Sequence, residues 1–354
     1  MCPASWKAIG FLLGAGALAT ACGNESNRPA AGGAAAGPTN SSGGASSGAS
    51  ASTAGAGSAA TGAVSGRSGA TSGGNGATAG DASGGQASAG ASGERPAACK
   101  RGVAYGHHSL ADLQALSAGV SWWYNWDFRP DQALRTGEYR NLGVEYAPMI
   151  WGAATDRQAA STAIADDAHV LLGFNEPNFG AQANLSAKAA ADLWPELEAI
   201  ADAKGLRLAS PAVNFCGGNC QDTDPFRYLD AFFAACSGCR VDVVAMHLYV
   251  GCTPTGNNKA EWLINHVETY KSRFKQPLWL TEFACDNAKD SAEQQAFLED
   301  AVAYLEAEPR IERYAWFSAR ASNVPHVDLL GDSGQLTTLG KAYVNAPQNS
   351  DCAR

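Results

Sequence analysis

The pattern of apolar and polar positions changes abruptly near Cys99. From residue 23 to residue 98 the chain is almost entirely Gly, Ala, Ser and Thr, with no aromatic residue and no apolar period. Such a segment cannot bury enough surface to offset its ordering entropy, so we expect a disordered linker. After it, short apolar runs alternate with segments whose apolar residues recur at helical spacing. We therefore expect one packed domain over residues 99–354.

Eight apolar runs in that domain predict buried strands, each followed by a helix or a loop. The expected strands are 103–106, 120–126, 144–151, 170–176, 206–212, 241–249, 277–283 and 313–318. The expected helices are 110–116, 155–166, 186–204, 225–235, 259–274, 292–306 and 338–345. Thr155 and Ser186 are the expected N-caps of two of them, and Gly205 the stop of the second.

Strands that alternate with helices predict parallel βαβ units and an α/β fold. Eight such units in about 250 residues predict closure into a (β/α)8 barrel, or TIM barrel. The competing fold is an open, doubly wound sheet, but no Gly-rich phosphate-binding fingerprint follows the first strand. In a barrel of this kind the active site lies at the C-terminal ends of the strands.

Residues 1–22 predict an export signal. Lys7 precedes an apolar run over residues 8–19, which is too short to span a bilayer and has the length of a signal-peptide core. Small residues precede Cys22, as in a bacterial lipoprotein signal, so a lipid anchor on Cys22 is one expectation and an ordinary cleaved signal is the other. In either case we expect the protein outside the cell or on its surface.

The composition excludes several partners. The chain carries a net charge of −9, which is unfavourable for binding nucleic acid or anionic lipid. We therefore expect no nucleic-acid partner and no membrane contact other than the lipid on Cys22. We also expect a monomer.

Cysteines set a second constraint on the packed domain. Apart from Cys2 and Cys22, the chain has Cys99, Cys216, Cys220, Cys236, Cys239, Cys252, Cys285 and Cys352. An even number in an exported chain predicts disulfides. We expect Cys252 to pair with Cys285, because both follow predicted strands, and Cys99 with Cys352, because they bracket the domain.

A zinc site is the alternative interpretation of the other four cysteines. Three residues separate Cys216 from Cys220, and two separate Cys236 from Cys239. This spacing is close to that of a zinc ribbon. An oxidising compartment favours disulfides instead.

Two of the predicted strands end in a glutamate. Glu176 closes the run that begins at Leu171, and Pro177 stops that strand one residue later. Glu282 stands near the end of the apolar run that begins at Leu278. Two carboxylates facing one cavity are what glycoside hydrolysis requires. We therefore predict Glu176 and Glu282 as the catalytic residues, and we expect burial and the neighbouring charge to raise the pKa of Glu176.

Amides, indoles, a histidine and a tyrosine at other strand ends are the candidates for binding substrate. They are Asn175, Asn178, Trp123, Asn125, Trp151, His247, Tyr249 and Trp316. His247 and Tyr249 alternate with one leucine and so share a strand face. Trp316 is expected to stack beneath the cleaved sugar.

The run from Trp122 to Trp126 cannot touch substrate with every side chain. Period two sends Trp122, Tyr124 and Trp126 to one face, and Trp123 and Asn125 to the other. Some of these residues must pack under the helices.

Five motifs together resemble glycoside hydrolase family 128. They are Trp122-Trp123-Tyr124-Asn125-Trp126, Gly173-Phe174-Asn175-Glu176-Pro177-Asn178, Ser210-Pro211-Ala212-Val213, His247-Leu248-Tyr249 and Trp279-Leu280-Thr281-Glu282-Phe283-Ala284-Cys285. The resemblance covers nearly the whole domain. It implies a β-1,3-glucanase with a (β/α)8 barrel, in which Glu176 is the acid/base, Glu282 the nucleophile and Asn175 the contact to the sugar 2-hydroxyl. No family pattern matches the pair His107-His108, to which we assign no role.

We therefore predict a retaining hydrolase that cleaves β-1,3-glucan by double displacement, with endo action and without cofactor or metal. Retention requires the two carboxyl groups to lie about 5 Å apart. One alternative is an enzyme for another β-linked glycan, such as mannan, xylan or mixed-linkage glucan. The other is a barrel at the cell surface that binds polysaccharide without cleaving it.

Overall fold

The computed structural model describes residues 99–254, 256–349 and 352. The export signal, the lipid site at Cys22 and the linker therefore lie outside the described residues. Among the helices of the described part, none is both long enough and apolar enough to cross a membrane.

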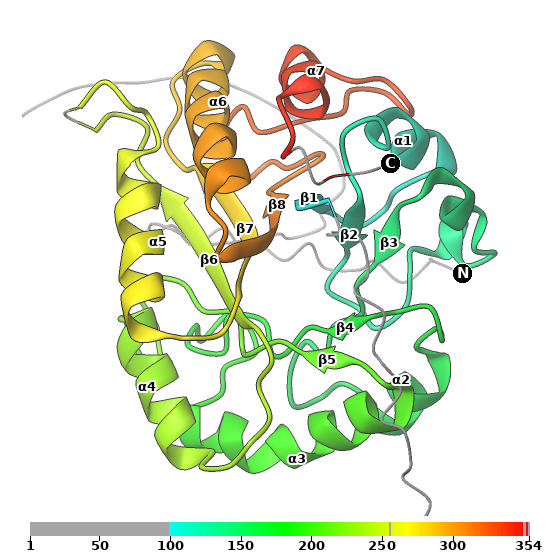
Figure 1. Cartoon of the computed structure of the whole chain (residues 1–354), viewed down its shortest axis with the longest axis vertical. Coiled ribbons are helices and arrows are strands. Elements are labelled where there is room, and N and C mark those ends of the chain that lie inside the picture. The colour runs from blue at the N-terminus through cyan, green and yellow to red at the C-terminus, as the bar shows by residue number, and fades with distance from the viewer. Residues whose placement is uncertain (1–98, 255, 350–351, 353–354) are drawn as a thin grey trace, which may run out of the picture. The chain divides into compact units, whose positions relative to one another are not determined.

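Eight short strands form the centre of the described part (Figure 1). They are β1 (Arg101–Ala104), β2 (Trp122–Tyr124), β3 (Glu145–Tyr146), β4 (Val170–Leu171), β5 (Arg207–Leu208), β6 (Val244–Val250), β7 (Leu278–Cys285) and β8 (Ile311–Trp316). Six of them make one sheet in the order β3-β2-β1-β8-β7-β6, and β4 pairs with β5. All of these pairs are parallel.

The first strand lies beside the last, since β1 pairs with both β2 and β8. This order differs from that of the doubly wound alternative. Single parallel bridges also join the smaller sheet to its neighbours. Met149 pairs with Leu172 on the β3 side, and Ala209 pairs with Val243 on the β6 side. The fold is thus α/β with parallel strands, and the units follow one another in chain order.

Three strands, β3, β4 and β5, have only two residues each, because particular residues interrupt the ladders along their longer apolar runs. Pro148 and Pro211 lack the N–H that a ladder needs in the runs of β3 and β5. Gly173 interrupts the run of β4. A Cβ at that position would lie 2.7 Å from the carbonyl oxygen of Ala209, so only glycine allows the two backbones to approach this closely.

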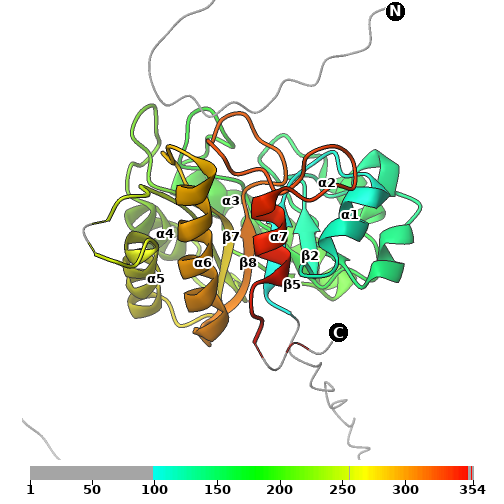
Figure 2. The same ribbon diagram turned by 90° about the horizontal axis from the view of Figure 1, so that it is seen from above.

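Helices cover the outer side of the strands (Figures 1 and 2). They are α1 (Leu110–Leu116), α2 (Arg157–Ala163), α3 (Ala187–Lys204), α4 (Pro225–Ala235), α5 (Glu261–Arg273), α6 (Ser291–Ala307) and α7 (Thr338–Asn345). Two 3-10 helices, Gln132–Leu134 and Glu138–Leu142, occupy the segment after β2. The longer helices bury a stripe of apolar side chains; Trp194, Leu197 and Ala201 are examples from α3.

The helix ends follow the expected signals with one exception. Ser186 caps α3, and Gly205 ends it in the left-handed conformation, as predicted. The prediction that Thr155 caps α2 is wrong. Asp156 is the N-cap, because its carboxylate accepts the N–H of Ala159, whereas the Thr155 hydroxyl accepts the N–H of Gly152.

Four disulfides form among the described cysteines. Cys99–Cys352 and Cys252–Cys285 confirm the two expected pairs. The remaining four cysteines form Cys216–Cys220 and Cys236–Cys239. The zinc interpretation is wrong, because each of these four cysteines forms a disulfide with the cysteine nearest to it in the sequence.

Candidate active site

Glu176 lies where the backbone leaves the β4 run. Its N–H donates to the carbonyl of Ala212 at 2.8 Å, which attaches this position to the segment after β5. Its φ of 38° is in the left-handed region, where a side chain other than glycine costs roughly 1 kcal/mol or more. The side chain is fully buried. A buried acid held in a strained conformation at a strand end is typical of a functional residue rather than of a structural one.

Glu282 sits within β7, next to His247 of β6 in the parallel register. Three neutral donors bind its carboxylate. The Tyr124 hydroxyl and the Trp126 indole N–H donate to Oε1 at 2.7 and 2.8 Å, and the Tyr249 hydroxyl donates to Oε2 at 2.6 Å. Both oxygens of the Glu282 carboxylate therefore accept hydrogen bonds, and these bonds fix its orientation.

His247 lies between the two acids. Its Nδ1 is 3.0 Å from Oε1 of Glu176 and 3.4 Å from Oε2 of Glu282. One oxygen of each carboxylate and one nitrogen of the imidazole all fall within 4.8 Å of one another. The same three atoms are close enough to share a metal ion. The two carboxylates therefore face one small space.

Burial and neighbouring charges shift the pKa values of these groups. It raises the pKa of Glu176 to about 7, against the opposing effect of the hydrogen bond from His247. Burial acts in the opposite direction on His247, but the charges of Glu282 and Glu176 outweigh it, and the pKa of His247 is raised. Burial also raises the pKa of Tyr124 and of Tyr249 well above 10, so both remain hydroxyl donors. The expected rise in the pKa of Glu176 is confirmed.

Several buried polar atoms at the centre have no hydrogen-bond partner within the described residues. They include Oε2 of Glu176, Oδ1 of Asn175, Nε1 of Trp151 and Nε2 of His247. Buried polar atoms in a folded protein are almost always paired, so a group of unpaired ones calls for an explanation. A bound polyhydroxylated ligand would supply the missing partners.

The structure corrects the expectations for the outer face of β2. Trp123 is fully buried, and its ring contacts the rings of Tyr139 and Tyr146 at 4.6 and 5.0 Å. The Asn125 amide donates to the carbonyl of Arg129 and to Asp131, and so closes the loop after β2. Neither residue reaches the glutamates. The alternation of side chains along the strand turns both away from the centre.

Trp316 also differs from its prediction. It is fully buried, and its ring packs against Phe283, Phe297 and Tyr343. Its indole N–H donates to the carbonyl of Val327. These contacts place it in the core beneath α6 and α7, so it is not a platform for a sugar.

Asn178 holds two loops, and its Oδ1 is a further buried atom with no hydrogen-bond partner within the described residues. Its amide group donates to the backbone carbonyls of Asn214 and Asp222 at 2.8 and 3.1 Å, and the residue is fully buried. It therefore positions the segment after β5. Trp151 is different, because its ring is only half-buried and its carbonyl accepts the N–H of Asn175 beside the acid.

The pair after β1 divides between surface and interior. His107 is exposed, with a φ of 65°, whereas His108 is buried and burial lowers its pKa to about 3. Both backbone N–H groups donate to the carboxylate of Asp131, at 2.9 and 3.1 Å. The pair thus ties the end of β1 to the loop after β2.

The residues predicted for the site do not include three that lie at its centre. Tyr124 and Trp126 bind Glu282, and the side-chain amide of Asn214 lies 3.5 Å from Oε1 of Glu176. The period-two pattern in the run from Trp122 already placed Tyr124 and Trp126 on one face. It could not show which face points inward, because both faces of a covered strand are apolar.

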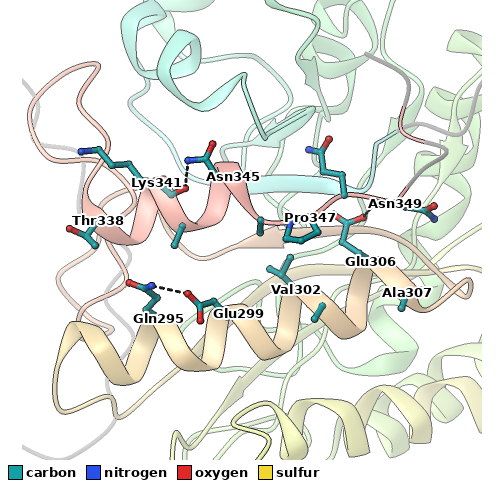
Figure 3. Close-up of a pocket in the computed structure, with 14 residues that line it drawn as sticks. Gln295, Glu299, Val302, Glu306, Ala307, Thr338, Lys341, Asn345, Pro347 and Asn349 are labelled. Atoms are coloured by element: carbon teal, nitrogen blue, oxygen red, sulfur yellow. Dashed lines mark hydrogen bonds between the residues drawn. The ribbon is translucent and has the colours of Figure 1, made fainter.

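A separate groove of about 900 Å³ lies between α6 and α7 (Figure 3). Glu299 and Lys341 are among the residues that line it. Neither catalytic candidate lines it, so this groove is not the candidate active site.

Comparisons with known proteins agree with this geometry. Residues 102–343 match the family model described as the glycosyl hydrolase catalytic core. An endo-β-1,3-glucanase of family 128, subgroup II, from Sorangium cellulosum is 64% identical, with a TM-score of 0.70 over 71% of this chain and 100% of that one. A subgroup II enzyme from Pseudomonas viridiflava is 36% identical, with a TM-score of 0.61 over 71% and 98%.

Two more distant relatives extend the comparison. A subgroup I endo-β-1,3-glucanase from Amycolatopsis mediterranei, solved with laminaritriose, is 33% identical over 70% of this chain and 100% of that one, with a TM-score of 0.57. Alkali-sensitive linkage protein 1 of Schizosaccharomyces pombe is 26% identical over 243 residues, 65% of this chain. The match spans only 41% of that relative's length. On the family model and the two subgroup II structures, the chain belongs to glycoside hydrolase family 128.

Proposed function

We propose that this protein hydrolyses β-1,3-glucan with retention of configuration, cleaving within the chain. The observation that carries the proposal is the pair of Glu176 and Glu282, with one oxygen from each within 4.8 Å of the other. Retaining glycosidases need about 5 Å between the carboxyl groups, whereas inverting enzymes need room for a water between them. The substrate class is drawn from the endo-β-1,3-glucanases that share the fold.

We infer that the strands form a (β/α)8 barrel. Parallel pairs join β1 to β8, and the bridges beside β4 and β5 support pairing on both sides of the smaller sheet. In such a barrel, strands four and seven bring their C-terminal ends to the same mouth. This architecture would account for the meeting of Glu176 and Glu282.

The mechanism has two steps. Glu282 attacks the anomeric carbon while Glu176 gives its proton to the glycosidic oxygen, which releases the first product and leaves a glycosyl ester on Glu282. Glu176, now ionised, then takes a proton from water, and that water cleaves the ester. The raised pKa of Glu176 supplies a proton near neutral pH, and the three donors around Glu282 orient its carboxylate. In this account Asn175 and Trp151 offer their unpaired atoms to the sugar in the cleaved position.

Reducing-sugar release tests the proposal. Laminarin and curdlan should be cleaved, and barley mixed-linkage glucan and mannan should release far less. Release from mannan or xylan in preference to laminarin would instead assign another β-linked glycan. Binding to curdlan without any release would indicate a polysaccharide-binding barrel. Activity of Glu282→Ala equal to that of the wild type would remove the nucleophile assignment.

We also propose that the protein is exported and acts as a monomer at the cell surface, anchored by lipid on Cys22. The apolar run before Cys22 and the buried disulfides support this location. Labelling with radioactive palmitate should mark the wild type and not Cys22→Ser. Labelling of neither, with the protein in the medium, would indicate a cleaved signal without lipid.

A further inference from the structure

Two large apolar side chains stand out on the surface of the described residues. Phe215 is 40% exposed and Trp262 is 39% exposed. Every other large apolar side chain in the described residues is less exposed than these two. His266 lies one helical turn after Trp262 on α5, on the same face of the helix. Its imidazole contacts the ring of Phe215 at a centroid distance of 4.6 Å. Phe215, His266 and Trp262 thus form one strip, which we call the aromatic rim.

The rim begins beside the acid/base. Asn214, whose amide lies 3.5 Å from Glu176, is followed directly by Phe215, and the Phe215 N–H donates to the Asn214 side chain at 2.8 Å. The backbone at this point therefore runs from the buried centre to the surface within one residue. The rim is continuous with the candidate active site.

The other end of the rim sits on a fixed loop. A Cβ added at Gly251 would lie 2.5 Å from the ring of Trp262, so the indole rests directly against the backbone of the segment after β6. The next residue, Cys252, is bonded to Cys285 at the end of β7. Figure 1 shows β6 pointing toward the loop that leads into α5. Trp262 is therefore held at the same end of the strands as the two glutamates.

The rim is also uncharged. Burial lowers the pKa of His266, so its imidazole is neutral at neutral pH. Flat apolar rings with one polar edge suit the faces of neutral sugars.

We propose that the aromatic rim binds the part of a long β-glucan chain that extends out of the active site past Glu176. This inference rests on the proposed function, since it takes its ligand from that function. The ligand class is a neutral β-1,3-glucan polymer. On this proposal the rim acts on chains long enough to extend beyond the two glutamates, and it has little effect on a short oligosaccharide held between them.

The experiment uses the full chain and the double variant Phe215→Ala/Trp262→Ala, with Asn265→Ala on the same helix as the matched control. Binding to curdlan is measured in a Glu282→Gln background, and hydrolysis is measured with the nucleophile intact. We expect the double variant to bind curdlan about 5- to 10-fold more weakly and to raise KM on laminarin. Its kcat on laminaritriose should stay within about twofold of the wild type. The single variant Trp262→Phe, which keeps an aromatic ring at this position, should retain most of the wild-type binding to curdlan.

Each contrary result has a distinct meaning. Curdlan binding by the double variant equal to that of the control would overturn the rim and leave the proposed function intact. A dimer in sedimentation that the double variant converts to monomers would also overturn it, because the rim would then be an interface with a second copy. Absence of cleavage of both laminarin and laminaritriose by the wild type would defeat the proposed function, and the inference with it.

Discussion

Glu176 and Glu282 share one imidazole, yet their surroundings differ. Glu282 accepts three hydrogen bonds from neutral donors, which cover both of its oxygens. Glu176 is bonded through one oxygen, and its other oxygen has no partner among the described residues. The three donors fix the orientation of the Glu282 carboxylate, whereas burial raises the pKa of Glu176 to about 7, so that Glu176 can hold a proton near neutral pH. This difference suits the roles that we propose, with Glu176 as the acid and Glu282 as the nucleophile.

Removal of Glu282 should have the largest effect. Glu282→Ala should lose on the order of 10⁴-fold or more of kcat on laminarin, because no glycosyl ester can form. Azide, which is small enough to fill the vacated space, should restore turnover and give an α-glycosyl azide. Glu176→Ala with azide should give the β-anomer, because azide then attacks the ester on Glu282. Identification of the azide products by NMR checks both, and reversed anomers would exchange the two roles.

Glu176→Gln should lose about 10²- to 10⁴-fold on laminarin, the usual size of a general-acid contribution. The loss should be much smaller on a dinitrophenyl β-laminaribioside, since that leaving group needs no proton. In the wild type, kcat/KM should fall as pH rises above about 7, where Glu176 ionises, and this limb should be absent in the variant. An equal loss on both substrates would mean that Glu176 is not the acid.

The buried proton of Glu176 should also affect stability. Its folded pKa of about 7 exceeds the ordinary value of 4.5, so folding favours the protonated form. That contribution is fully present below pH 4.5 and is lost as pH rises through about 7. Glu176→Gln, which cannot ionise, should therefore gain stability over the wild type between these pH values, by on the order of 3 kcal/mol at pH 8. Urea unfolding from pH 4 to 8 measures this, with the exposed Glu138→Gln as control; parallel curves for all three proteins would contradict it.

Single donors to Glu282 should matter less. Tyr249→Phe and Tyr124→Phe should each lower kcat by about 10- to 100-fold, because each removes one hydrogen bond to a charged group. KM should change little. Tyr228→Phe removes a buried hydroxyl that donates to the carbonyl of Leu185, and it serves as the matched control. If Tyr228→Phe loses as much kcat as Tyr249→Phe and Tyr124→Phe, the loss reflects damage to the fold and not the missing hydrogen bond to Glu282.

The smallest effect separates the two faces of β2. Trp123→Phe should cost about 1–2 kcal/mol of stability and leave kcat/KM within about twofold, because its ring packs against Tyr139 and Tyr146. Trp126→Phe should instead lower kcat, since it removes a donor to Glu282. Thermal unfolding and laminarin kinetics on the two variants distinguish the faces. A drop in kcat/KM for Trp123→Phe but not for Trp126→Phe would show instead that Trp123 lies on the face toward the active site.

The sequence predicted well those features that depend on local pattern. The strand-end glutamates, the alternation that pairs His247 with Tyr249, and the cap at Ser186 all follow from spacing and residue type. Two disulfides followed from the positions of their cysteines at strand ends and domain ends.

Features that depend on which side of a strand faces inward could not be predicted in this way. The sequence does not distinguish Trp123 and Asn125 from Tyr124 and Trp126, because a strand covered on both faces has no polar side to orient it. The position of Trp316 at a strand end predicts a place in the site, but its side chain lies in the core because of contacts with α6 and α7. The roles of Asn178 and of the loop at Asn214 depend on hydrogen bonds between distant segments, which spacing does not encode.

The stereochemistry of cleavage tests the central claim most directly, because it reports whether two carboxylates this close act through a covalent ester. Proton NMR of the wild type acting on laminarihexaose should show the β-anomer of the new reducing end first, with the α-anomer growing in only by mutarotation. An α-anomer as the first product would show inversion by a single displacement, and would contradict the account.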